Sequence, residues 1–513
     1  MGSLASHSIS RIAIIGAGPS GISCAKYLLA EKTFEKIDIF EQRWKVGGVW
    51  NLTSNVQSFH TPVPQLDPNF EQGVRPLAAR THEATGHAGA NGEKTYDNTH
   101  GQFVDETPMY ETLETNIPKQ LMQYAEKPFD DQLPVFPGHE SVLKYCNEYA
   151  QEVKRLIHFG CQILDVRPVR HSSENEKDNS FSWSVTIADK SSLKATSYEY
   201  DAVVVASGHY NVPSIPDIQG LQRWSKAYPT SVLHSKAYRH PATFTGKKVI
   251  IVGNSASGTD IGAQVGQFCR LPLLQSSRSS SIFLSPGGNK TWKEDIPEIV
   301  EFLNPQAHDR GVRLADGRVE DKIDIVLFAT GYFYSFPFLH LDRPVISTGS
   351  RTKDVYQQIF HIDLPTLAFP LLTQKVIPFP FVENQAAVIA RVWSGRLSLP
   401  SKREMRAWEA KMLADRGDGK AMHVLNFPQD ADHLNILYDW AASASPRLPG
   451  LENEGRGKLG TRWGDKQRWT RSQFPAIRKA FVERGEARYG VRTIEELGFN
   501  YGEFIREQVR SSE

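Results

Sequence analysis

One stretch near the start of this chain decides its fold: Ile12-Ala13-Ile14-Ile15-Gly16-Ala17-Gly18-Pro19-Ser20-Gly21. A short β-branched run leads into a tight turn of small residues, and the segment after Gly21 has helical periodicity. In such a strand–turn–helix unit, backbone N–H groups and the helix N-terminus cradle a pyrophosphate. We therefore predict a dinucleotide site whose turn consists of Gly16, Gly18, Pro19, Ser20 and Gly21.

The next strand-like segment indicates which dinucleotide this turn binds. It ends at Glu41, twenty residues beyond Gly21. A carboxylate at that point accepts hydrogen bonds from both ribose hydroxyls and repels a 2′-phosphate, so we predict FAD rather than NADPH. Gln42 and Arg43 follow directly, and we place Arg43 near the diphosphate or the adenine.

Paired glycines, Gly47 and Gly48, come soon after this acidic strand end. Glycine lets the backbone approach the flat flavin ring or the diphosphate, because no Cβ intervenes. We therefore add Gly48, Val49 and Trp50 to the predicted FAD site.

A second glycine turn follows the run Val249–Val252 and reads Gly253-Asn254-Ser255-Ala256-Ser257-Gly258. The strand-like segment about twenty residues beyond it ends in Ser277 and Arg278 instead of an acidic residue. A guanidinium flanked by hydroxyls suits a 2′-phosphate, which predicts NADPH, although Arg278 equally fits a solvated surface arginine. The residues predicted for this site are Gly253, Asn254, Ser255, Ser257, Gly258, Ser277 and Arg278. Two dinucleotide sites suggest electron transfer from a nicotinamide to a flavin.

Composition narrows the class of protein. The chain has 513 residues, enough for two or three domains, and a net charge of +1 that provides no electrostatic footprint for nucleic acid or an anionic membrane. Its four cysteines are scattered without a CxxC pair, which favours reduced thiols and a cytoplasmic location.

No apolar run approaches the roughly 20 residues that span a bilayer. The histidines between Asn51 and Thr107 are irregularly spaced, so we expect no metal site. Gly2 formally matches an N-myristoylation pattern, and its modification stays open.

Together these motifs resemble the flavin-containing monooxygenases, most closely the soluble yeast and fungal members. The similar segments are GAGPSG at 16–21, GGVWN at 47–51, GNSASG at 253–258, and the strand exits ASGHY at 206–210 and FATGY at 328–332. The resemblance implies an α/β fold with two Rossmann-like dinucleotide-binding domains. An NADPH-binding domain, residues 213–331, would be inserted into a discontinuous FAD-binding domain, residues 1–212 and 332–513. Residues 51–107 would form a long loop insertion, and the C-terminus a helical extension.

The family fingerprint FxGxxxHxxx[FY] is matched in part. His234 and Tyr238 agree with it, whereas Tyr228 and Thr230 replace Phe and Gly. A β-branched residue such as Thr230 adopts positive φ only with difficulty, which puts that position in doubt. The resemblance implies that His234 couples the domains and places NADPH, although a satisfied structural histidine fits equally well.

The resemblance also assigns residues to the flavin. Tyr110–Lys119 is similar to the family segment with an asparagine beside the flavin, which implies that Asn116 lies near flavin N5 and the bound NADP. Without the resemblance, Asn116 fits a turn residue before Ile-Pro. Gln385 is a candidate for a further flavin contact.

The reaction implied by the family begins when NADPH reduces FAD and O₂ adds to give a C4a-(hydro)peroxyflavin. A soft nucleophile, the amine nitrogen or the thiol or thioether sulfur of a small molecule, then attacks the distal oxygen. The protein positions the rings and excludes water. Three alternatives remain: a Baeyer–Villiger oxygenation of a ketone, disfavoured by Tyr238 and Asn116; a disulfide reductase, disfavoured by the missing cysteine pair; and a flavin-binding protein without turnover.

Overall fold

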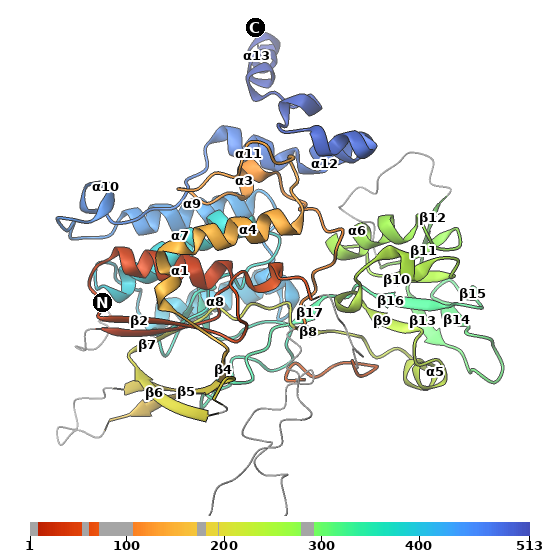
Figure 1. Ribbon diagram of the computed structural model, residues 1–513, viewed down its shortest axis with the longest axis horizontal. Coiled ribbons are helices and arrows are strands. Elements are labelled where there is room, and N and C mark those ends of the chain that lie inside the picture. Colours follow the sequence, from red (N-terminus) through yellow and green to blue (C-terminus); the bar gives the residue numbers. More distant parts are fainter. Residues whose placement is uncertain are drawn as a thin grey trace, which may run out of the picture.

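The structure, a computed structural model, describes residues 9–53, 61–70, 106–171, 181–192, 194–278 and 292–512. Two sheets with parallel cores dominate it, and they lie side by side in Figure 1. Most of the predicted insertion at 51–107 lies outside the described residues. Gly2, which matches the N-myristoylation pattern, also lies outside them.

The first sheet has seven strands in the order β18-β19-β20-β7-β1-β2-β3. Strands β20, β7, β1, β2 and β3 run parallel. The bounds are β1 Arg11–Ile15, β2 Lys36–Glu41, β3 Ile157–Phe159, β7 Ala202–Val205, β18 Val355–Tyr356, β19 Phe360–His361 and β20 Leu367–Ala368.

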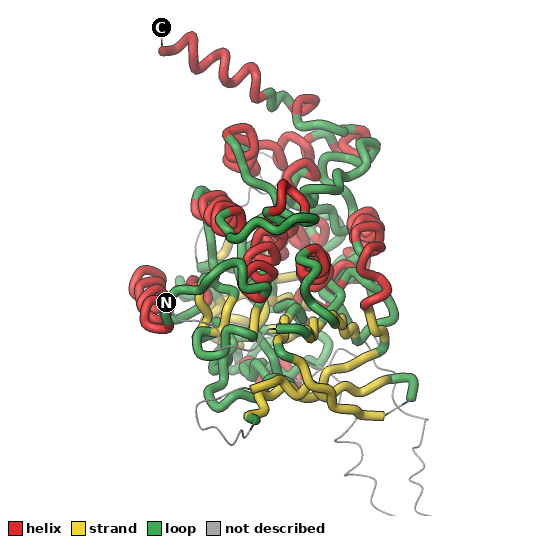
Figure 2. Tube along the Cα trace, turned by 90° about the vertical axis from the view of Figure 1, so that its left-hand side faces the viewer, coloured by secondary structure: helices red, strands yellow, loops and turns green. Residues whose placement is uncertain are grey.

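Strand β1 is buried on both faces, and its side chains alternate between two cores. Ile12 and Ile14 pack beneath the helices α1 (Pro19–Ala30), α4 (His139–Tyr149) and α7 (Pro378–Trp393). Ala13 and Ile15 face the opposite side, which an antiparallel sheet of β4 (Cys161–Arg170), β5 (Phe181–Asp189) and β6 (Lys194–Tyr200) covers. Figure 2 shows the resulting layers, with helices on one side and this small sheet on the other.

The second sheet has five parallel strands in the order β12-β11-β10-β16-β9. The bounds are β9 Val232–His234, β10 Val249–Val252, β11 Leu273–Ser276, β12 Lys293–Ile296 and β16 Ile325–Phe328, with helices α5 Leu221–Ala227 and α6 Ala256–Val265. A small antiparallel sheet packs beside it, formed by β13 Ile299–Phe302, β14 Val312–Leu314 and β15 Val319–Glu320.

The chain passes between the two sheets twice. The outward crossing is β8 (Val212–Pro213), the return is β17 (Tyr332–Phe333), and the two pair antiparallel with each other. The predicted α/β fold, with one dinucleotide-binding domain inserted into another, is confirmed. The boundaries predicted at 212 and 332 fall on this ribbon.

The C-terminal part is helical. Its α-helices are α8 Lys402–Arg416, α9 Gln429–Ala442, α10 Glu452–Gly455, α11 Asp465–Ser472, α12 Phe474–Glu483 and α13 Tyr501–Ser512.

Short helical elements also occur along the rest of the described chain. The short α-helix α3 spans Lys119–Met122. The 3₁₀ turns are η1 Gly48–Trp50, η2 Gln151–Leu156, η3 Ser235–Ala237, η4 Pro241–Phe244, η5 Lys420–His423, η6 Gly485–Gly490 and η7 Glu495–Leu497. Helix α13 projects from the body of the molecule (Figures 1 and 2). Among the described helices, none combines the length and apolar character that a bilayer crossing requires.

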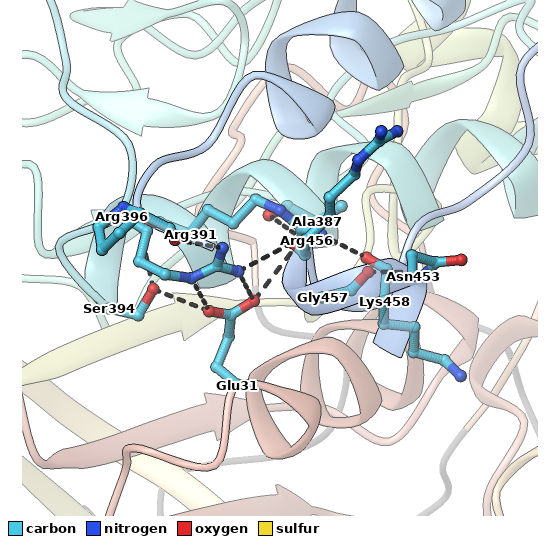
Figure 3. A network of polar contacts seen from close by, with 10 residues as sticks. Glu31, Ala387, Arg391, Ser394, Arg396, Asn453, Arg456, Gly457 and Lys458 are labelled. Carbon is cyan, nitrogen blue, oxygen red and sulfur yellow. Dashed lines mark hydrogen bonds and ion pairs between the residues drawn. The ribbon is translucent and has the colours of Figure 1, made fainter. Parts of the chain in front are cut away.

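A buried ion pair locks the ends of α1 and α7 together (Figure 3). The Glu31 carboxylate, directly after α1, accepts hydrogen bonds from Arg396 Nη2 at 2.6 Å, Arg396 Nε at 2.8 Å and Ser394 Oγ at 3.0 Å. Arg391 Nη1 lies 3.8 Å away, and its Nη2 donates to the carbonyl of Lys458. Because all three charged groups are almost fully buried, water screens their attraction weakly, and they hold the end of α1 against the end of α7.

Candidate active site

The first glycine turn connects β1 to α1, and the fold itself requires two of its glycines. Gly16 has φ +103°, and a Cβ there would lie 2.7 Å from the Ala206 carbonyl oxygen. A Cβ at Gly21 would lie 1.9 Å from the Gly16 oxygen. Gly18 differs, because its backbone is extended (φ −75°) and its Cβ would meet only Gly48, with Cα at 3.5 Å and N at 3.9 Å. Nothing inside the described chain demands glycine at this position, so the demand fits a ligand lying against the turn.

The paired glycines rest against this turn. The Gly47 N–H donates to the Ala17 carbonyl at 3.1 Å, and a Cβ at Gly48 would lie 2.9 Å from Gly18 Cα. Gly48, Val49 and Trp50 form η1, so the structure brings the two predicted motifs together. Pro19 and Ser20 open α1 beside them.

Glu41 braces the first turn from the end of β2. Its Oε2 accepts from the Ala17 N–H at 2.8 Å and its Oε1 from the Arg43 N–H at 2.9 Å, and the side chain is buried. Arg43 Nη1 also lies 3.9 Å from Glu41 Oε1, and the hydrogen bonds from Glu41 to the ribose stay a prediction. Gln42 follows, half-buried. Arg43 Nε is buried and has no hydrogen-bond partner among the described residues, which suits an anionic ligand.

The second turn repeats this geometry between β10 and α6. Gly253 has φ +105°, and a Cβ there would lie 2.6 Å from the Ala329 oxygen. A Cβ at Gly258 would lie 2.0 Å from the Gly253 oxygen. The third position is Ser255, which is exposed, as is Ser257, while Asn254 is half-buried. The same cradle therefore occurs twice, and both copies fit a dinucleotide pyrophosphate.

Arg278 lies beyond the end of β11, next to Ser277, whose N–H donates to the Ile296 carbonyl. The Arg278 side chain is 83% exposed and its Nε lies 2.7 Å from Glu298 Oε2. A 2′-phosphate bound here would compete with Glu298. Residues 279–291, which follow, are outside the described part of the chain.

His234 sits at the end of β9, where the domains meet. Its Nδ1 accepts from the Lys236 N–H at 3.1 Å, so Nε2 carries the proton and donates to the Gly331 carbonyl at 3.0 Å. Burial lowers the pKa of His234 to about 3, so the ring is neutral. Both nitrogens are used within the chain, and any effect on NADPH passes through these contacts. The doubt raised by Thr230 disappears, because that residue does not have a positive φ.

Asn116 is exposed, between the buried Thr115 and half-buried Ile117. The segment contacts both domains, through Tyr110 on one side and Thr115 on the other. Gln385 is fully buried in α7, where its Oε1 accepts from the Leu371 N–H at 2.7 Å. Its Nε2 has no partner among the residues described here. A buried amide with one unused donor suits a nearby acceptor, and its role as a flavin contact stays a prediction.

Two basic residues were not predicted from the sequence, although Lys236 lies within the fingerprint segment and Arg239 directly follows it. Lys236 is buried, and its Nζ donates to the Asn211 carbonyl at 2.7 Å. Burial lowers the pKa of Lys236 to about 7, while Glu106 opposes the shift. Arg239 donates to the carbonyls of Thr53 and Thr107, closing the base of the insertion. Within the described ranges, no group of three or more His, Cys, Asp or Glu residues is arranged to hold a metal.

The sequence profile described as flavin-binding monooxygenase-like matches residues 103–298 and 305–424. The chain belongs to this family. A profile described as NAD(P)-binding Rossmann-like domain matches residues 14–67. The predicted family and the predicted cofactors, FAD and NADPH, are therefore confirmed, and the protein is a flavin monooxygenase.

Individual relatives cover most of the chain. The thiol-specific monooxygenase of Saccharomyces cerevisiae is 30% identical over 438 residues, 82% of this chain and 82% of its own length. A flavin-containing monooxygenase of Amanita muscaria, iboF, is 26% identical over 85% of this chain and 89% of its own. The structure of S-allyl-L-cysteine S-oxygenase from Allium sativum is similar with a TM-score of 0.69 and 27% identity, covering 95% of this chain and 96% of that one. Cyclohexanone monooxygenase, at 12% identity and a TM-score of 0.51, shares the fold.

Proposed function

We propose that this protein uses NADPH and O₂ to transfer one oxygen atom to a soft nucleophile of a small molecule, with thiol or thioether sulfur favoured over amine nitrogen. For a thioether the balanced reaction is R₂S + O₂ + NADPH + H⁺ → R₂SO + NADP⁺ + H₂O. Sulfur is favoured because two of the most similar proteins, from yeast and Allium, carry sulfur oxygenation in their names. The bound flavin supplies electron transfer from NADPH and activation of O₂.

One observation supports the proposal: the same strand–turn–helix geometry occurs twice, at Gly16–Gly21 and at Gly253–Gly258, and Asn116 is exposed on a segment that contacts both domains. The turn at Gly18 and the loop at Gly48 hold one dinucleotide, and the turn at Gly253 holds the other. His234 keeps the junction in place as a neutral ring. Asn116 offers an amide donor and acceptor to the groups bound between the cradles.

We also propose that the domains divide at the crossings, after residues 212 and 331, because β8 and β17 belong to neither parallel sheet. A cytoplasmic location is our further proposal. It is supported by the absence of disulfides among the cysteines, all four of which are free.

The proposal is tested by adding NADPH to the FAD-loaded protein without oxygen and then admitting O₂ with a thioether, a tertiary amine or a cyclic ketone. We expect flavin bleaching by NADPH, followed by sulfoxide as the main product, measured by mass spectrometry. Lactone from the ketone would establish the Baeyer–Villiger alternative instead. Protein that keeps its flavin but is not bleached by NADPH would be a binding protein without turnover.

Asn116→Ala tests the predicted catalytic residue. We expect flavin reduction at the wild-type rate, with less product and more H₂O₂ per NADPH consumed. The control is Gln120→Ala, an exposed amide one turn further along on α3. Full product yield in Asn116→Ala would return this residue to the role of a turn former.

A further inference from the structure

The segment Tyr110–Ile117 begins attached to the NADPH-binding domain. Tyr110 Oη donates to Asp260 Oδ2 on α6 at 2.5 Å, and Thr112 Oγ1 donates to Gln264 Oε1 at 2.5 Å. The Glu111 N–H donates to the Arg239 carbonyl at 3.2 Å. The first three residues of the segment therefore move with α6.

The rest of the segment is attached to the other domain. The Thr115 N–H donates to the Pro137 carbonyl at 2.9 Å, and the Leu113 carbonyl accepts from the His139 N–H at 3.1 Å. The segment thus changes domains within a few residues, and Asn116 follows immediately. In Figure 1 this orange stretch, leading up to α3, runs between the two sheets.

Helix α12 of the C-terminal extension contacts the changeover through one guanidinium. Arg478 Nη2 lies 3.1 Å from Glu114 Oε2 and 3.8 Å from Asp260 Oδ1, so it bridges carboxylates from the two sides. Its guanidinium also stacks over the Phe136 ring at 4.9 Å. Arg488 Nη2 pairs with the other oxygen of Glu114 at 3.0 Å. The Arg478 and Glu114 side chains are only 23% and 13% exposed, so water and salt screen this contact weakly.

We infer that Arg478 is a positioning residue, which fixes the Asn116 segment relative to α6 by holding Glu114 and Asp260 together. Two carboxylates from different domains repel each other unless a cation lies between them. Without Arg478, the segment keeps its backbone contacts with each domain but loses the positive charge that attracts both Glu114 and Asp260. The functional consequence rests on the proposed role of Asn116, whereas the placement itself does not.

The placement is measured by hydrogen–deuterium exchange of the FAD-loaded protein. We compare wild type with Arg478→Leu, which keeps apolar contact with Phe136, and Arg478→Lys, which keeps the charge. We expect Arg478→Leu to speed exchange in peptides covering 110–117 about tenfold, while Arg478→Lys restores part of the protection. The matched control is Arg468→Leu on the neighbouring α11, which removes an arginine paired at 2.7 Å with the exposed Asp432.

A merely structural role for Arg478 predicts a different pattern, in which exchange rises throughout α12 and the residues packed on it, Val135 and Phe136. That pattern, or unchanged exchange in 110–117, overturns the inference. The same variants report on function through the share of NADPH electrons recovered as H₂O₂, which we expect to rise at least about threefold in Arg478→Leu with the KM for NADPH unchanged. Faster exchange in 110–117 with an unchanged H₂O₂ share supports the placement and overturns the proposed role of Asn116.

Discussion

Gly18→Ala tests whether glycine is required at this position for ligand binding or for folding. The extended backbone of Gly18 suits alanine, and the new methyl would meet Gly48 Cα at an ordinary 3.5 Å. Where the backbone is compatible, Gly→Ala stabilises a protein by about 0.4–1 kcal/mol. The variant should therefore fold at least as well as wild type. A diphosphate against the turn, however, would be displaced from two backbone N–H groups, each contributing about 1.5–3 kcal/mol.

The expected loss of about 3–6 kcal/mol corresponds to FAD affinity lowered about 10²- to 10⁴-fold. We expect colourless purified protein with wild-type circular dichroism and a melting temperature at least equal to that of the wild-type apoprotein. The dissociation constant follows from fluorescence quenching when FAD is added to the apoprotein. The matched change in the second turn, Ser255→Gly, should retain FAD.

The refuting result is Gly18→Ala with stoichiometric FAD and a wild-type dissociation constant, because the diphosphate then does not lie at Gly18. Gly21→Ala provides the contrast, since its methyl would lie 1.9 Å from the Gly16 oxygen and should prevent folding. A Gly18→Ala protein that fails to fold would contradict the assignment of its contact with Gly48 as tolerable.

Three further predictions follow from the charges. Arg278→Ala should raise the KM for NADPH by about 10- to 100-fold, because it removes a contact of about 1.5–3 kcal/mol, and should leave the KM for NADH unchanged. Glu298→Gln should lower the KM for NADPH. Equal effects on the two KM values would show that Arg278 does not bind the 2′-phosphate. Glu31→Gln should lower the free energy of unfolding in urea by about 3–5 kcal/mol, because it leaves buried cations without a counter-charge. Glu483→Gln, which removes an exposed pair with Lys479, should lower it by less than about 1 kcal/mol. Burial raises the pKa of Glu383 from 4.5 to about 7, so the folded state binds more protons than the unfolded state between these values. The contribution of Glu383 to stability is complete below pH 4.5, and up to about 3 kcal/mol of it is lost as pH rises through 7. In urea unfolding at both ends of this pH range, Glu383→Gln should not show this loss of stability.

Local patterns predicted the two turns and their strands, because a strand, a glycine turn and a helix are encoded within a few consecutive residues. Glycine is required at Gly16 and Gly253 because a Cβ would collide with the carbonyl oxygen at the end of the neighbouring strand, that of Ala206 or Ala329 respectively. The Ser-x-x-Glu pattern at Ser401 and Glu404 is equally local, and these two residues form the capping box that opens α8.

Long-range packing limited the rest. A similar Thr-x-x-Glu pattern at Thr493 and Glu496 forms both hydrogen bonds of a capping box, yet only the three-residue η7 follows. A local box does not determine how far a helix continues. Lys236 looks like a surface residue in sequence, and only the packing of both domains buries it. Arg478 lies far along the chain from Glu114, so no spacing pattern connects them.

The ribbon of β8 and β17 has a consequence for motion. Its strands pair with each other and with neither parallel sheet, so the ribbon forms one hinge. Bending it breaks no ladder hydrogen bond inside either sheet, and hinge motions of this kind occur in microseconds to milliseconds. Motion of the inserted domain about this ribbon would have to break its other contacts with the first domain, among them the ion pair between Arg478 and Asp260. The first turn, held by Glu41 and Gly47, would stay assembled during that motion. With the cofactor assignment that we propose, NADPH would bind to the half that moves and FAD to the half whose turn stays assembled.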